Sequence, residues 1–197
     1  RTFYSKIKQI FESFVCKIFD FWFKSDMNKT ILLLEFDPST YGDLLTELSK
    51  YKKNILIYNR RKPAIWNMSS IKTLRKTKSK LFNFKKLEFQ FKKQISSLTN
   101  NYLNELEKVW QNKDFENFFQ IESLSFWYCI KDELLNVYQK RLPEYISLLL
   151  ISKNLLEKID VSCILSSNLV GETEKSVLSM NNQKIHSIML EHGYSNY

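Results

Sequence analysis

One histidine of the chain is placed where it could do chemistry. His192 ends an apolar run, follows Glu191 and precedes Gly193, so the backbone can turn away without a side chain in its path. An imidazole at that position can act as a general base towards a hydroxyl group or donate a hydrogen bond to a phosphate. The alternative is a histidine that packs or caps a helix. The other histidine, His186, lies inside the apolar run, and we interpret it as structural.

The residues before His192 predict a strand, a helix and a second strand. Two short apolar runs within residues 159–193 are separated by a stretch with helix composition. Strands joined by such a crossover are parallel, and in open parallel sheets ligands bind outside the carboxyl ends of the strands. Ser166 and Asn168, which end the first run, should therefore face the same crevice as His192.

Residues 30–58 predict a second unit of the same kind. Thr30–Phe36 is typical of a buried parallel strand, a helix follows to Tyr51, and Asn54–Tyr58 is the next strand. The side chains that follow these strands are candidates for binding a substrate: Asp37, Ser39, Tyr41, Asn59, Arg60 and Arg61. The cations after the second strand, with Lys62 beside them, suit a phosphate group, and a solvated basic loop is the alternative.

The fold class that these patterns predict is α/β, with a Rossmann-like parallel sheet flanked by helices. Residues of about 64–158 predict a large helical insertion, although Leu81–Phe91 also alternates like a strand. Pro143 should interrupt the helical region. Only three Gly and three Pro occur in the chain, which disfavours an all-β fold rich in turns.

Residues 1–25 predict a separate amphipathic helix. Apolar residues recur there at the helical period, and lysines lie among them. Such a helix could lie in the plane of a membrane, or pack on the domain formed by residues 26–197 or on a partner. We favour packing, because Glu12 and Asp20 dilute the cationic face.

The composition limits the partners and the chemistry. A net charge of +9 favours anionic partners such as nucleotide phosphates, lipid head groups or nucleic acid. The three cysteines are far apart and flanked by apolar residues, as expected of buried free thiols in a reducing compartment. No apolar run reaches the roughly 18 residues of a membrane-spanning helix, so a cytoplasmic location is expected. Phosphate-binding glycine loops, zinc motifs and serine-hydrolase motifs do not occur, and we expect neither a metal nor a cofactor.

Four stretches of the sequence carry a resemblance to a known family. They are Glu191-His192-Gly193, the strand end Leu165–Asn168, the segment Glu35–Tyr41 and the segment Asn59–Trp66. In type and order they resemble the corresponding segments of surface-polysaccharide biosynthesis proteins, which are glycosyltransferases of the GT-B type with a Gln-His-Gly or Glu-His-Gly motif. The resemblance covers most of residues 30–197.

The resemblance implies that residues 26–197 are the acceptor-side domain of an enzyme that transfers a sugar or related group from a nucleotide-activated donor. The donor would be a substrate, held mainly by a second Rossmann-like domain that this sequence does not contain, so the chain alone should be inactive. His192 would be the catalytic or phosphate-contacting residue, with Glu191 as its partner and Gly193 in the same loop. The acceptor would be a glycan or a lipid-linked glycan.

A basic binding module without chemistry is the alternative function. It would bind a membrane surface or nucleic acid through residues 1–25 and 60–93, where cations alternate with aromatic residues. Nucleic acid is the less favoured partner, because no RNA-binding aromatic signature or zinc-finger spacing occurs. An enzyme that acts on lipid-linked acceptors would combine both functions as a peripheral protein at the inner face of the cell membrane.

Overall fold

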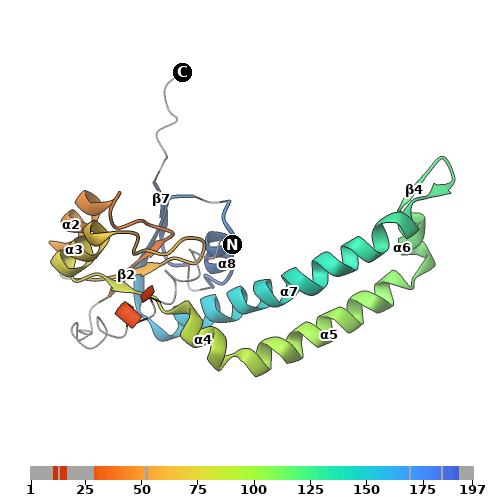
Figure 1. The fold of residues 1–197 in the computed structure, drawn as a ribbon, viewed down its shortest axis with the longest axis horizontal. Helices are drawn as coiled ribbons and strands as arrows, with labels where there is room; N and C mark the ends of the chain where they lie inside the picture. The colour runs from red at the N-terminus through yellow and green to blue at the C-terminus, as the bar shows by residue number, and fades with distance from the viewer. Residues whose placement is uncertain are drawn as a thin grey trace, which may run out of the picture. The chain divides into compact units, whose positions relative to one another are not determined.

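The computed structural model describes residues 11–12, 14–16, 29–51, 53–168, 170–182 and 184–190. The chain divides into two compact units, and each is described by itself. Unit 1 comprises residues 1–87 and 151–197, and unit 2 comprises residues 88–150. Figure 1 shows the helices and strands of both units.

Unit 1 is built on a parallel sheet, which is five-stranded in the described part of the chain. Its strands are β1 (Thr30–Leu34), β2 (Asn54–Tyr58), β3 (Lys80–Leu81), β6 (Val161–Ser166) and β7 (Ser187–Met189). They lie in the order β3-β2-β1-β6-β7, and each neighbouring pair is parallel. The chain builds outwards from β1 to β3 and then crosses to the other side of β1. The predicted α/β class with a parallel, Rossmann-like sheet is confirmed.

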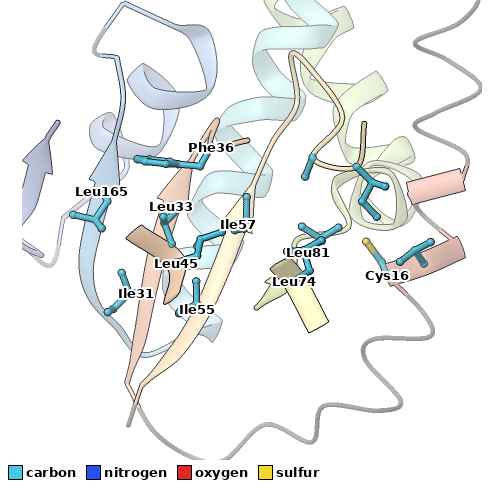
Figure 2. Close-up of a cluster of buried hydrophobic side chains, with 13 residues drawn as sticks. Cys16, Ile31, Leu33, Phe36, Leu45, Ile55, Ile57, Leu74, Leu81 and Leu165 are labelled. Atoms are coloured by element: carbon cyan, nitrogen blue, oxygen red, sulfur yellow. The ribbon is translucent and has the colours of Figure 1, made fainter. Parts of the chain in front are cut away.

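The core of unit 1 lies between this sheet and the helices that cover it. Those helices are α2 (Gly42–Ser49), α3 (Met68–Thr77), α8 (Glu172–Ser179) and the last residues of α7 (Trp127–Lys158). All five residues of β1 are buried, and alternate side chains of a strand point to opposite faces. Leu33 and Ile57 belong to one buried cluster with Leu45 of α2 and Leu74 of α3 (Figure 2). Because both faces of β1 are buried, its sequence is continuously apolar instead of alternating.

Local sequence signals fix the ends of α3. The Asn67 side chain accepts a hydrogen bond from the backbone N–H of Ser70 at 2.9 Å and so caps the first turn. Lys78 ends the helix in the left-handed conformation with φ 52°, and its N–H and that of Ser79 bond back to the last turn. The helix end therefore delivers the chain directly into β3.

Unit 2 is mainly helical. It contains the end of α4 (Phe84–Gln90), α5 (Lys92–Trp110), α6 (Lys113–Asn117), the hairpin β4 (Gln120–Ile121) and β5 (Leu124–Ser125), and the first part of α7. The alternating stretch Leu81–Phe91 is helical from Phe84, and only Leu81 belongs to a strand. The break predicted at Pro143 is wrong, because α7 continues through it and buries Ile146, Leu148 and Ile151 beyond it. The predicted domain boundaries stay a prediction.

Five residues of the predicted amphipathic segment are described, and the rest of residues 1–25 lies outside the described part of the chain. The five are helical. Val15 and Cys16 belong to the buried cluster of unit 1, whereas Phe11 and Phe14 are 49% and 62% exposed. These residues support packing on the domain over a position in a membrane. Among the described helices, none is long and apolar enough to cross a membrane.

The three thiols are free, as expected from their spacing, but they are not uniformly buried. Cys16 is buried and Cys163 is partly buried, and burial raises the pKa of Cys163. Cys129 is exposed on α7.

The burial of the Glu12 carboxyl predicts that the stability of the protein depends on pH. Burial raises the pKa of Glu12 from 4.5 to about 7, and the backbone N–H groups of Ile65 and Ala64 oppose this shift only in part. Folding therefore gains from the protonated carboxyl at pH values below about 4.5, and this gain is lost as pH rises through about 7. Glu12→Gln should stabilise the protein at pH 8 by on the order of 1–3 kcal/mol relative to wild type, and much less at pH 5.

Urea unfolding at the two pH values measures this difference. Glu157→Gln, which removes an exposed carboxylate from α7, serves as the matched control and should change stability little at either pH. An equal effect of Glu12→Gln at pH 5 and pH 8 would contradict the assignment.

Candidate functional site

A pocket of about 530 Å³ lies at the carboxyl edge of the sheet in unit 1. Its lining residues follow three neighbouring strands: Glu35, Asp37, Thr40 and Tyr41 after β1, Asn59, Arg61, Lys62, Pro63 and Trp66 after β2, and Ser167 after β6. The strand order reverses between β1 and β6, so the loops that leave these two strands diverge to opposite sides of the sheet. A crevice at this reversal is the usual ligand site of open parallel sheets, and the volume suits a small ligand.

The structure brings some of the predicted substrate-binding residues together and excludes others. Asp37, Tyr41, Asn59 and Arg61 line the pocket. The pocket lining does not include Ser39, Arg60, Ser166 or Asn168. The Ser166 hydroxyl donates to the backbone oxygen of Asn168 and accepts from its N–H, so these two residues stabilise their own turn.

Asp37 holds the turn between β1 and α2. Its Oδ1 atom accepts the backbone N–H of Ser39 at 2.9 Å and the Ser39 hydroxyl at 2.7 Å, and Oδ2 accepts the Thr40 hydroxyl at 3.2 Å. Tyr41 follows with its ring edge-to-face against Phe36, 4.8 Å between centroids. The hydrogen bonds of Asp37 fix this turn and so position the Tyr41 ring at the pocket wall.

Glu35 connects three segments at the edge of the sheet. It has φ 60°, a left-handed conformation that is costly for a residue with a side chain, and its side chain is only 5% exposed. The carboxylate accepts the backbone N–H groups of Arg60 at 2.9 Å and Arg61 at 3.1 Å, and the Thr173 hydroxyl at 2.7 Å. One buried side chain therefore fixes the end of β1, the loop after β2 and the start of α8.

Arg60 and Arg61 are held by carboxylates of α8. Arg60 Nη1 lies 3.1 Å from Glu172 Oε2, and Arg61 Nη2 lies 2.6 Å from Glu174 Oε1. Arg60 is 8% exposed and faces the Phe84 ring, whereas Arg61 is 41% exposed and reaches the pocket. The sequence left both a phosphate site and a solvated basic surface open for this loop. In the structure both arginines form ion pairs, and one of them lines the pocket.

Glu174 is fully buried behind Arg61. Burial raises its pKa, and the Arg61 charge opposes that shift in part. Its second oxygen, Oε2, has no hydrogen-bond partner among the described residues and lies over Gly171, where a Cβ atom would come within 2.0 Å of it. Gly171 has φ −70°, so its role is to leave space and not to adopt an unusual backbone conformation.

The remaining polar groups of the pocket make fewer hydrogen bonds and ion pairs with the described residues. The Asn59 amide donates to the backbone oxygen of Phe36 at 2.7 Å, and its Oδ1 atom is buried without a hydrogen-bond partner among the described residues. Lys62 is exposed and makes no ion pair with the described residues. Ser167 is 7% exposed and lies at the wall formed by β6.

The predicted catalytic residues lie outside the described residues, as does Gly193. The last residue that the structure describes is Leu190, and its N–H donates to the backbone oxygen of Ser166 at 2.9 Å. His186 stands directly before β7, and its backbone oxygen accepts the N–H of Ile164 at 2.9 Å while its side chain is exposed. The roles assigned to Glu191 and His192 stay predictions.

The residues that sequence reasoning did not select include Glu35, Trp66, Ser167, Glu172 and Glu174. Glu35 and Ser167 each sit one residue beyond a strand, which is the signal that could have found them. Glu172 and Glu174 pair with arginines more than 110 positions earlier in the chain, a relation that spacing alone does not encode. Within the described residues, no three His, Cys, Asp or Glu side chains are grouped so that they could hold a metal ion.

No family model matches the chain, and neither a curated protein nor a solved structure matches it significantly. The functional conclusion therefore depends on the pocket and on the resemblance seen in the sequence.

The close packing of Glu174 on Gly171 predicts that the effects of substitutions at these two positions on stability are not additive. Gly171→Ala places a methyl group on the Glu174 carboxylate and must displace it from its buried position beside Arg61, at a cost of about 1–3 kcal/mol. In a Glu174→Ala background the clash is absent, and the same substitution should cost less than about 0.5 kcal/mol. Urea unfolding of the four proteins of this cycle measures both values, and an equal cost in both backgrounds would refute the packing described here.

Proposed function

We propose that this chain is the acceptor-side domain of a glycosyltransferase-like enzyme that uses a nucleotide-activated donor in surface-polysaccharide biosynthesis. The single observation that carries the proposal is the pocket at the strand-order reversal, whose walls come from the loops after β1, β2 and β6. The sequence resemblance selects this function among those that a Rossmann-like sheet can host.

The chemistry of the pocket supports a sugar-like ligand. Tyr41 and Trp66 supply aromatic rings, which pack well against the apolar face of a sugar ring. Thr40, Asn59 and Ser167 supply hydroxyl and amide groups at the same walls, and these can bind sugar hydroxyls. A few polar groups that fix orientation, placed among apolar surface, are typical of small-molecule sites.

His192 is proposed as the general base or phosphate contact, with Glu191 as its orienting partner. The position of Leu190 supports this role, because its bond to Ser166 brings the end of the described chain to the carboxyl edge of β6. His192 follows two residues later, within reach of that edge. A base there would remove the proton of the acceptor hydroxyl as it attacks the donor carbon, while the nucleotide leaves.

The donor nucleotide is proposed as a substrate held mainly by a second domain, and the acceptor as a glycan or a lipid-linked glycan. A basic surface supports a location at an anionic membrane face. Residues 48–87 contain thirteen Lys and Arg and no Asp or Glu. On α3, Lys72 and Lys76 are exposed along one stripe with Met68. A binding module without chemistry remains the second candidate, because this surface would serve it equally well.

Transfer of a labelled sugar from nucleotide-activated donors to glycan acceptors, catalysed by the full-length gene product, tests the proposal. His192→Ala should lower kcat/KM by about 10²–10⁴-fold, as expected for loss of a general base. His186→Ala, which removes the exposed histidine next to β7, is the matched control and should leave transfer nearly unchanged. Trp66→Ala should raise the acceptor KM more than it lowers kcat.

Unchanged transfer in His192→Ala would remove His192 from the mechanism. An absence of transfer with every donor, together with binding to anionic vesicles that weakens steeply with salt, would contradict the enzyme and favour the binding module.

A further inference from the structure

Arg61 is held from behind in a way that leaves part of its guanidinium group free to bind. An arginine side chain has five N–H donors. One of them is used at 2.6 Å by Glu174, and Glu35 lies 3.8 Å from Nε. Among the described residues, the guanidinium group makes no further hydrogen bond, and it lines the pocket with 41% of the side chain exposed.

The two carboxylates behind Arg61 cannot easily move. Glu35 is fixed by two backbone N–H groups and the Thr173 hydroxyl. Glu174 is 0% exposed and is confined by Gly171. A planar guanidinium group held on two sides by fixed carboxylates keeps its orientation, so less entropy is lost when a ligand binds to its remaining donors.

Glu174 carries an observation that a purely structural ion pair does not explain. Its Oε2 atom is buried and has no hydrogen-bond partner in the part of the chain that the structure describes, although unsatisfied buried oxygens are costly. Among the described residues, the N–H donors of Arg61 Nη1 have no acceptor. Lys62, the next residue, also lines the pocket and has no acidic partner in the described chain. Two neighbouring cations at one wall match the oxygens of an anionic group.

We infer that the pocket selects a ligand that carries a carboxylate or phosphate group, that Arg61 and Lys62 bind this group, and that Glu174 is the residue that positions Arg61. The inference deepens the proposed function and rests on it only for the view that the ligand is a sugar. An acidic sugar would place its ring against Trp66 and its anionic group against the two cations.

Three probes of the same ring size separate the contributions: glucose, glucuronate for the carboxylate and glucose 6-phosphate for the phosphate. Binding to the 197-residue chain is measured by ligand-observed NMR titration. At least one anionic probe should bind about tenfold or more tightly than glucose, because hydrogen bonds to charged groups contribute about 1.5–3 kcal/mol. Whichever anionic probe is preferred identifies the group that the site takes.

Substitutions then test the named residues. Lys62→Ala should reduce this preference for the anionic probe, whereas the matched control Lys175→Ala, an exposed lysine of α8 outside the pocket lining, should not. Glu174→Ala should lose the preference, because Arg61 is no longer oriented, while Glu174→Gln should restore it, since an amide oxygen can still accept from Arg61. Circular dichroism shows whether each variant folds. If Glu174→Ala does not fold, the effect of Lys62→Ala on the preference for the anionic probe tests the inference.

The inference is overturned if the wild-type chain binds all three probes equally or binds neither anionic probe. It is also overturned if folded Glu174→Ala keeps the wild-type preference, which would leave Glu174 a structural role only. These results are independent of transfer activity, so an enzyme without preference for anionic sugars would keep the proposed function and remove only this inference.

Discussion

The carboxylate of Glu35 is the constraint on which the rest of this site depends. It stands one residue beyond the central strand, buried, on a backbone with φ 60°, a conformation that is costly for a residue with a side chain. Its oxygens bond to the loop after β2 and to the start of α8, which are far apart in the sequence. Removing it would leave two loop N–H groups without a partner near the end of the sheet, and the loop after β2 and the start of α8 would lose their shared contact with the end of β1.

Around this anchor the charges are arranged in pairs. Three carboxylates, from Glu35, Glu172 and Glu174, face the two arginines of the β2 loop. Pairs of this kind give little net stability when buried, because desolvation offsets most of the attraction between the charges, but breaking one by removing a partner is costly. Their value is geometric, since they orient Arg61 at the pocket wall and hold Arg60 away from it.

Sequence reasoning succeeded where the physical cause is local. The strands β1, β2 and β6 are buried on both faces and therefore appear as continuous apolar runs, from which the parallel sheet and its ligand edge follow. Asp37 and Asn59 were found because they come directly after such runs. The strand β3 has two residues and leaves no pattern to detect. Pro143 failed as a helix breaker because the packing of the residues beyond it outweighs one missing hydrogen bond.

The arrangement of the arginines could not be predicted, because it depends on partners brought close only by the fold. Arg60 and Arg61 look alike in the sequence, yet one is sequestered and the other lines the pocket. Amide hydrogen exchange at these two residues tests the account most directly. In the wild-type protein both amides should be protected, and Glu35→Ala should speed their exchange at least about tenfold while the amide of Ile57 inside β2 stays protected. Exchange at Arg60 and Arg61 that does not change on removal of Glu35 would contradict the anchoring role of this carboxylate.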